Sequence, residues 1–352
     1  MAKLLITVCV WVCFCHRSLA WNAEGHMVVA QIAYNHLDSA AKTKCDTLIA
    51  VPLTYGSSAN SNFVTAACWA DDYKSYLGTA IWHYIDLPFS LDGTSTSGVA
   101  TASFDVVQAI NLSISTLQNS TATLSNQAIS LRYLLHFAGD IQQPLHCSTA
   151  VSAARPSGDA GGNTFYINGN WSNLHSLWDA GGGYLSDSLF RPLSSSDQAV
   201  LDSKVADVEA AYPYTPNPGT ISNPMDWAQE GLGLAQTVSY VGITTNSAPS
   251  SAYLNTAQAT TEQRMAQGGH RLADLLVTLF GAKPVRLTCL PLANGRVGFS
   301  WGAVSGQTYR VQWKQRLRDS AWNDLTNVTA SGSSASFSES PCQTERFYRV
   351  AQ

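Results

Sequence analysis

Apolar positions in residues 21–281 recur mainly every three or four residues, which is the spacing of amphipathic helices. The clearest case is residues 125–141, where Leu131, Leu134 and Ala138 lie on one apolar stripe. Pro144 ends this pattern, because proline breaks the hydrogen-bond ladder of a helix. The same spacing predicts helices at residues 26–36, 40–50, 63–77, 104–117, 125–141, 195–211, 225–241 and 251–280.

From Val285 the pattern changes to strict alternation, as in Val297, Phe299 and Trp301. Between such runs stand turn residues such as Asn294-Gly295. The pattern predicts a small, fibronectin-like β-sandwich over residues 285–352. The fold class we expect is therefore a mainly α domain, residues 21–283, followed by a small all-β sandwich.

Residues 1–20 have the form of a secretory signal peptide. Lys3 precedes an apolar run, and Ser18-Leu19-Ala20 is a small-residue cleavage site. We expect cleavage after Ala20 and export to an extracellular or periplasmic space. No later segment reaches the roughly 20 apolar residues of a membrane-spanning helix, so we expect no membrane association.

Charge and cysteine content add two expectations. The formal net charge of −4 provides no basic footprint for tight duplex binding, so metal ions or stacking would have to hold a nucleic acid. In an oxidising compartment, Cys45 with Cys68 and Cys289 with Cys342 are the sensible local disulfides, which leaves Cys147 over.

Two histidine–aspartate pairs carry the candidate chemistry. His136 and Asp140 are four residues apart, so a helix projects them from one face, and His146 follows the break at Pro144. His175 and Asp179 repeat the spacing. Imidazole and carboxylate are ligands that zinc prefers. The alternative is that each pair is a helix-surface contact or a satisfied core histidine.

Further candidates lie nearer the N-terminus. Cleavage would make Trp21 a terminus whose amino and carbonyl groups can chelate a metal, with His26 opening the next helix. Asp71 sits among apolar neighbours, where an unpaired carboxylate is costly. Residues 82–88 are predicted to be extended, with His83 on one face and the ring of Tyr84 and the carboxylate of Asp86 on the other.

These motifs, in order along residues 21–281, resemble the zinc-dependent single-strand nucleases of fungal and plant type. The resemblance implies a helical fold that holds three zinc ions. The first would bind Asp71, His83, His136 and Asp140, and the second His146, His175 and Asp179. The third would bind Trp21, His26 and a bridging Asp140.

The same resemblance implies catalytic roles for Asp71, Lys74 and Asp140, and substrate contacts for Tyr84, Asp86 and Lys74. At position 74 the family often has an arginine, whereas this chain has Lys74. A lysine keeps the positive charge but cannot form the two parallel hydrogen bonds that a guanidinium group makes with a phosphate. The implied enzyme cleaves single-stranded DNA and RNA to 5′-phosphate products, attacks 3′-nucleotides and is a monomer.

Two other functions fit part of the pattern. A zinc-dependent phospholipase C would share the helical fold and a metal-binding terminal tryptophan, although Tyr84 with Asp86 suits a base better than a choline head group. A non-catalytic secreted binding protein would use the β-domain as its active part.

Overall fold

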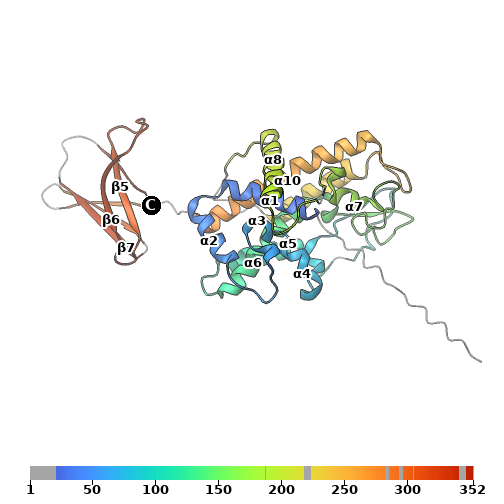
Figure 1. Ribbon diagram of the computed structural model, residues 1–352, viewed down its shortest axis with the longest axis horizontal. Helices are drawn as coiled ribbons and strands as arrows, with labels where there is room; N and C mark the ends of the chain where they lie inside the picture. Colours follow the sequence, from blue (N-terminus) through green and yellow to red (C-terminus); the bar gives the residue numbers. More distant parts are fainter. Residues whose placement is uncertain are drawn as a thin grey trace, which may run out of the picture. The chain divides into compact units, whose positions relative to one another are not determined.

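The computed structural model describes residues 21–100, 102–186, 188–217, 223–281, 285–292, 296–303, 305–340 and 346–351. The chain divides into two compact units, the first ending at Gly281 and the second running from Ala282 to Gln352. Figure 1 shows that the first is helical and the second is built of strands. The predicted leader, residues 1–20, lies outside the described residues.

Ten α-helices are described in the first unit: α1 (Ala23–His36), α2 (Ser39–Ile49), α3 (Phe63–Ala66), α4 (Trp69–Leu77), α5 (Val106–Gln118), α6 (Leu124–Asp140), α7 (Leu174–Asp179), α8 (Ser195–Ala211), α9 (Pro224–Leu234) and α10 (Ser251–Phe280). Many begin at a residue whose side chain accepts a hydrogen bond from a free amide of the first turn. Asp105 does this for α5, and Ser194 for α8. The mainly α fold class expected for this part of the chain is confirmed.

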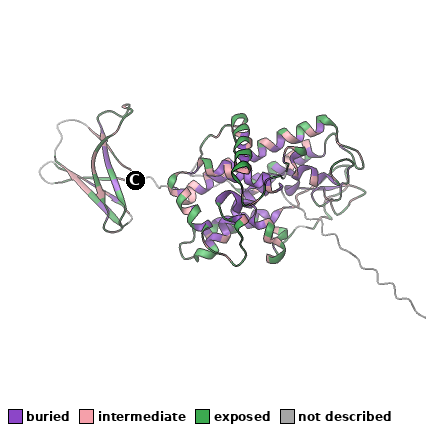
Figure 2. Cartoon of the chain, in the orientation of Figure 1, coloured by how far each residue is buried: buried purple, intermediate pink, exposed green. Residues whose placement is uncertain are grey.

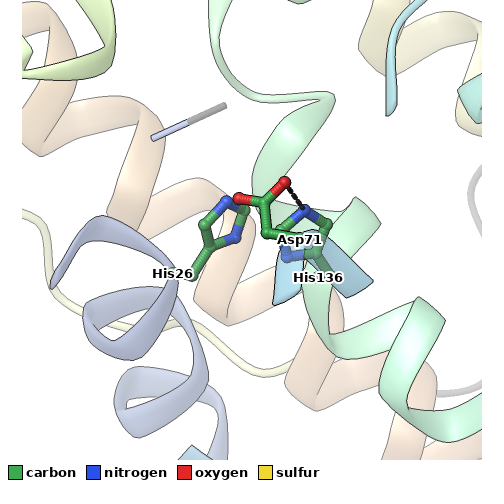
Figure 3. A group of neighbouring side chains, drawn as sticks. All are labelled: His26, Asp71 and His136. Carbon is green, nitrogen blue, oxygen red and sulfur yellow. Dashed lines mark ion pairs between the residues drawn. The ribbon is translucent and has the colours of Figure 1, made fainter. Parts of the chain in front are cut away.

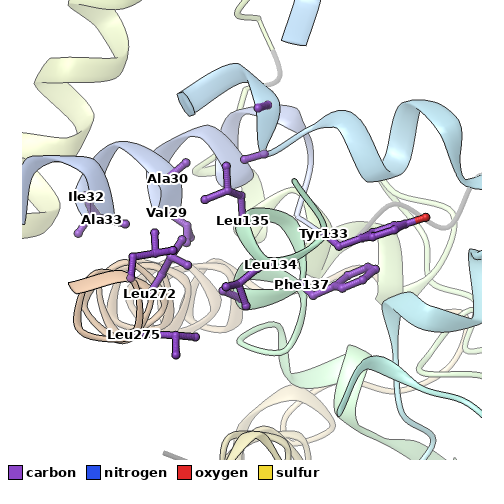
Figure 4. Close-up of a cluster of buried hydrophobic side chains, with 14 of the residues drawn as sticks. Val29, Ala30, Ile32, Ala33, Tyr133, Leu134, Leu135, Phe137, Leu272 and Leu275 are labelled. Carbon is purple, nitrogen blue, oxygen red and sulfur yellow. The ribbon is translucent and has the colours of Figure 1, made fainter. Parts of the chain in front are cut away.

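The core of this unit forms where α1, α6 and α10 pack together (Figure 4). Leu134 of α6 and Leu272 of α10 are fully buried in it. Gly269 of α10 lets the helices approach closely, since a Cβ there would lie 2.4 Å from Cγ2 of Ile32 in α1. Figure 2 shows that the buried faces of these helices point inward. This packing sets the position of His26, on α1, relative to His136 and Asp140 on α6.

The structure corrects four local predictions. Residues 63–77 form two helices, because a turn at Ala67 and Cys68 interrupts the helix. Residues 225–241 form α9 followed by a π-helical turn, η5 (Ala235–Ser239). The start of residues 82–88 is helical rather than extended, since the 3₁₀ turn η2 (Ala80–His83) includes His83. Asn168-Gly169, a typical hairpin turn, predicts a β-hairpin at residues 164–171, but the structure has there one isolated bridge between Tyr166 and Asn173.

A short parallel pair of strands lies next to the segments that carry Tyr84 and His146. β1 (Pro88–Ser90) pairs with β2 (Thr149–Val151), which follows the 3₁₀ turn η3 (Pro144–Cys147). The amide of Ile85 donates to the carbonyl of His146 at 2.8 Å. The pair therefore fixes the segment of Tyr84 and Asp86 beside the turn that carries His146.

The second unit has two antiparallel three-stranded sheets, with strand orders β3-β4-β7 and β6-β5-β8. Its strands are β3 (Thr288–Pro291), β4 (Val297–Gly302), β5 (Thr308–Lys314), β6 (Asn323–Thr329), β7 (Ser334–Glu339) and β8 (Phe347–Ala351). Trp301 of one sheet and Tyr309 of the other are buried edge to face, with ring centroids 6.0 Å apart. The small all-β module is thus confirmed, whereas the predicted turn at Asn294-Gly295 lies outside the described residues.

The predicted Cys45–Cys68 disulfide is absent, since both residues are thiols. Burial raises the pKa of the Cys45 thiol, and the Cys68 thiol donates to the carbonyl of Ala23. Burial also raises the pKa of Cys147 to about 12, which makes that thiol a poor metal ligand. Cys289 is exposed, and its expected partner, Cys342, lies outside the described residues.

No helix in the described part of the chain has both the length and the apolar character that crossing a bilayer requires.

Candidate metal centre

Six helical segments converge on one buried cluster of imidazoles and carboxylates. The cluster consists of His26 from α1, Asp71 from α4, His83 from η2, His136 and Asp140 from α6, His146 from η3, and His175 and Asp179 from α7. The described structure contains three groups of these residues whose ligand atoms lie within 4.8 Å of one another. All eight side-chain ligands expected from the sequence are thus brought together.

Asp71, His83, His136 and Asp140, the ligands expected for the first zinc ion, have the spacing of a tetrahedral zinc site, and we call them the first group. Nδ1 of His83 lies 3.0 Å from Oδ2 of Asp140 and 3.6 Å from Oδ1 of Asp71. Nε2 of His136 lies 3.2 Å and 3.7 Å from the same two oxygens. Zinc bonds of about 2.0–2.2 Å would set the ligand atoms about 3.4 Å apart. The four atoms therefore enclose a space of the size that one zinc ion occupies.

The second group consists of His146, His175 and Asp179, and its ligand atoms lie slightly farther apart. Nε2 of His175 lies 3.2 Å from Nε2 of His146 and 3.5 Å from Oδ2 of Asp179. Nε2 of His146 lies 4.0 Å from the other carboxylate oxygen, Oδ1 of Asp179. Three protein ligands and one open side are the arrangement of a catalytic zinc site.

His26 lies against the first group. Its ring stacks on that of His136 with centroids 3.8 Å apart, and its Nε2 lies 3.4 Å from Oδ1 of Asp140. Figure 3 shows His26, Asp71 and His136 drawn together from three helices. Asp140 thus faces His26 with one oxygen and His83 and His136 with the other, as a carboxylate that bridges two ions would.

Trp21 is held beside this group by two hydrogen bonds. Its indole nitrogen donates to the carbonyl of Gly139 at 3.1 Å, and the next amide, of Asn22, donates to the carbonyl of Asp179. The ring is fully buried. The backbone of Trp21 is therefore fixed next to the cluster, as its predicted role requires.

Backbone carbonyls set the tautomer of three of the histidines. Nδ1 of His136 lies 2.6 Å from the carbonyl of Ala67, and Nδ1 of His175 lies 2.6 Å from that of Gly161. Nδ1 of His146 lies 2.7 Å from the carbonyl of His83. A carbonyl can only accept, so each Nδ1 carries the hydrogen and each Nε2 offers a lone pair to the cluster. This is how metal-ligating histidines are usually oriented.

The electrostatics of the cluster also suit a cation. Burial, followed by neighbouring imidazoles, holds the pKa values of His26 and His83 well below the usual range, so these rings are neutral. Burial raises the pKa of Asp140 to about 6. Both oxygens of Asp140 are buried without a hydrogen bond of acceptable geometry. Such a group is costly unless a positive charge compensates it, which a metal ion would do.

A cavity of about 280 Å³ opens beside the second group. It is lined by Tyr84, Asp86, Leu145, Ala160, Gly161, Asn163 and His175. Burial, and then the charge of Asp159, raises the pKa of Asp86 to about 6. The cavity thus offers an aromatic ring and a carboxyl group next to a candidate metal ligand.

Lys74 lies at the entrance of the first group, with Nζ 2.9 Å from Oδ1 of Asp71. Its side chain retains 13% of its exposed surface, so solvent and a ligand can reach it. The structure therefore places all the sequence-predicted site residues around one centre with an adjoining cavity.

Two supporting residues were not assigned a role from the sequence. The side-chain nitrogen of Gln143 donates to Oδ1 of Asp179 at 2.8 Å, and its side-chain oxygen, Oε1, accepts from the amide of Leu145. Arg191 forms a bidentate pair with Asp72, the neighbour of Asp71. The position of Gln143 between two ligand-bearing segments could have indicated its role. No local pattern identifies Arg191, because it is 119 residues from its partner.

Buried histidines oriented by backbone carbonyls, together with clustered carboxylates, form a metal site of the kind that metal-dependent hydrolases use. The family model described as S1/P1 nuclease matches residues 21–281. The chain belongs to the S1/P1 nuclease family, and it is a hydrolase that acts on phosphodiester bonds.

Named relatives agree with this assignment. The chain is 28% identical to Endonuclease 3 of Arabidopsis thaliana, over 79% of this chain and 95% of that protein. It is 26% identical to Nuclease P1 of Penicillium citrinum, over 75% of this chain and 99% of that protein. With Nuclease S1 of Aspergillus oryzae it shares 29% identity, over 52% of this chain and 64% of that protein. These matches support a nuclease over the phospholipase and the non-catalytic alternatives.

Proposed function

We propose that the mature chain is a secreted zinc endonuclease that hydrolyses single-stranded DNA and RNA to 5′-phosphate products, with 3′-nucleotidase activity. The observation that supports it best is the buried cluster of histidines and carboxylates. Backbone carbonyls orient three of these histidines, and the ligand atoms lie close enough together to share a zinc ion. The relatives named endonuclease and nuclease provide the substrate class.

The residues divide among three zinc ions. Asp71, His83, His136 and Asp140 would hold the first, and His146, His175 and Asp179 would hold the second. His26, the amino and carbonyl groups of Trp21, and Asp140 would hold the third. Bound zinc would supply Lewis-acid stabilisation of phosphate oxygens and would lower the pKa of an attacking water from 15.7 towards about 7.

The protein's own groups prepare the site for that chemistry. The fixed tautomers of His136, His146 and His175 keep each Nε2 unprotonated and aimed inward. Lys74 supplies a positive charge at the entrance, where a bound phosphate would compete with Asp71 for its ammonium group. A single charge there contributes electrostatic attraction without a bidentate fork.

The preference for single strands follows from the cavity. Tyr84 can stack only on a base that has left its partner, and base–aromatic stacking is worth about 1–3 kcal/mol. Asp86 supplies a carboxyl group that can hydrogen-bond the edge of that base. The cavity would therefore select unpaired nucleotides, whereas the zinc-binding residues would hold the ions that polarise the phosphate.

Enzyme assays and elemental analysis of the purified mature protein test the proposal together. We expect three zinc ions per chain, release of 5′-phosphate products from single-stranded DNA and RNA, and at least tenfold slower cleavage of duplex. Removal of zinc by a chelator should abolish activity, and zinc should restore it. Full activity in chelator would refute the proposal, as would turnover of phosphatidylcholine in place of nucleic acid.

A further inference from the structure

The charge of the chain is divided unequally between its two units. Residues 282–352 contain nine Lys and Arg against four Asp and Glu, a formal charge of +5. Residues 21–281 contain nine Lys and Arg against twenty Asp and Glu, a formal charge of −11. The total of −4 conceals this division. A polyanionic strand is therefore repelled by the net charge of the helical unit and attracted by that of the β unit.

The outward face of the β6-β5-β8 sheet carries part of this positive charge. Tyr309 and Val311 of β5 are buried in the core of the unit, so the alternate residues Arg310, Gln312 and Lys314 lie on the opposite face of the sheet. On that face Arg310 is exposed, whereas Gln312 and Lys314 are covered by neighbouring side chains. Residues paired across antiparallel strands share a face. Gln312 pairs with Arg349 of β8, which places the two exposed arginines, Arg310 and Arg349, on one surface. We call this surface the basic face.

Neutral groups hold the cations of the basic face in position. The ring of Trp322 lies under Nζ of Lys314 at 4.6 Å and under the guanidinium of Arg349 at 4.5 Å. Nε of Arg349 donates to Oε1 of Gln312 at 2.8 Å. Lys314 donates to the carbonyls of Leu317 and Asp319. These contacts reduce the freedom of the side chains without neutralising them.

In the described part of the β unit, no carboxylate forms an ion pair with the cations of the basic face. Within the described part of the β unit, the ion pair that the structure shows is Arg346 with Glu339. Asp324, the acidic group on the basic face, accepts from Gln312 rather than from an arginine. Two more exposed arginines, Arg316 and Arg318, lie in the loop that follows β5. The charge of the exposed arginines is thus available to an external anion, whereas Lys314 is buried.

We propose that the basic face of the β unit binds the phosphate backbone of single-stranded nucleic acid. This goes beyond the proposed function, since it gives the β unit a separate binding site, and it relies on the nucleic-acid substrates of the family. Guanidinium groups suit phosphate oxygens geometrically. Retention of the strand on the β unit would offset the repulsion by the acidic helical unit.

The decisive variant is Arg310→Gln with Arg349→Gln, and its matched control is Arg286→Gln with Arg296→Gln. The control removes the same charge from exposed arginines of the same unit, but from the region of β3 and β4. Binding of a labelled 20-nucleotide oligo-dT is measured by fluorescence anisotropy. All proteins are full mature chains with Asp140→Asn, so that the strand survives.

At about 50 mM salt, the basic-face variant should bind about tenfold more weakly, and the control should change by less than about twofold. The slope of log K against log salt should fall by about 1.4 for two lost phosphate contacts. In the zinc-loaded enzyme, KM for long strands should rise and KM for a dinucleotide should not. Binding is measured without turnover, so an inactive enzyme would contradict the proposed function but leave this site testable.

Three results would overturn the proposal. One is unchanged affinity and salt slope in the basic-face variant, and another is an equal loss in the control. A third is binding to phosphatidylserine vesicles without binding to the oligonucleotide, which would make the face a membrane contact. Should the double variant unfold, as seen by thermal denaturation, Arg310→Gln alone is decisive, because Arg310 is exposed on the same face. It should show about half the change in slope.

Discussion

Single residues in this site are oriented by the main chain as much as by one another. The carbonyls of Ala67, His83 and Gly161 each receive an imidazole Nδ1 hydrogen. Because these carbonyls belong to ordered turns and helices, the rings are preorganised before any ion binds. The site should therefore bind metal without large rearrangement.

Asp140 faces two of the three proposed ions, so its replacement has a distinctive effect. Asp140→Asn should reduce bound zinc from three ions to about one and lower kcat more than about a hundredfold, because it removes the negative charge shared by two sites. Elemental analysis and a single-strand assay measure both effects. The control is Asp226→Asn, on α9 and outside the cluster, which should retain three ions. An unchanged zinc count in Asp140→Asn would contradict the bridging role.

Gln143 tests the importance of a residue that touches a ligand and not the metal. Gln143→Leu should lower the affinity of the second zinc about 10- to 100-fold, since Asp179 loses the donor that orients it. Competition with a zinc chelator measures the affinity. Gln142→Leu is the matched control, since it loses a hydrogen bond to Arg271 but leaves Asp179 untouched. Equal zinc affinities of the two variants would rule out the orienting role.

At the scale of elements, the crossing of α1 and α10 depends on small residues. Gly269→Ala should destabilise the protein by about 1–3 kcal/mol, because its Cβ would overlap Ile32 of α1. Gly233→Ala, on α9, should be neutral or stabilising by up to about 1 kcal/mol, since open space surrounds it and alanine favours a helix. Thermal and denaturant unfolding measure the two changes. Equal effects would show that the crossing tolerates a methyl group.

Spacing within one element could be predicted from the sequence, and contacts between elements could not. The pairs His136–Asp140 and His175–Asp179 follow from helical periodicity and are confirmed as neighbours. That the pairs lie in one cluster depends on tertiary packing, which only the resemblance to a family indicated. The 3₁₀ turn that carries His83 was missed, because residues 80–83 have no helical repeat long enough to detect.

The β unit shows the same limit. Strands β4 and β5 alternate clearly and were predicted. Strands β6 and β7 were not, because both are edge strands with few apolar residues, as in Asn323–Thr329. The charge of this unit was also missed, since the whole-chain total of −4 averages two opposite values.

At the scale of the whole molecule, the proposed third ion depends on where the mature chain begins. A protein with one extra alanine before Trp21 should lose about one zinc ion and most of its activity, because the terminal amine becomes an amide that cannot bind the metal. A matched protein with one alanine added after Gln352 should be unaffected. Mass spectrometry, elemental analysis and a single-strand assay measure the outcome. Unimpaired cleavage by the extended chain would contradict the role of the terminal amine.

Trp21 is buried against Gly139, and the amide of Asn22 donates to the carbonyl of Asp179, so these two residues are part of the site itself. With cleavage after Ala20, as proposed, an enzyme assembled in this way would be a zymogen whose pro-segment is the export leader. Before translocation it would lack a complete catalytic centre, and the transcripts of the cell that makes it would be spared. Latency would then need no inhibitor protein, because the same proteolytic cut that releases the enzyme outside would also activate it.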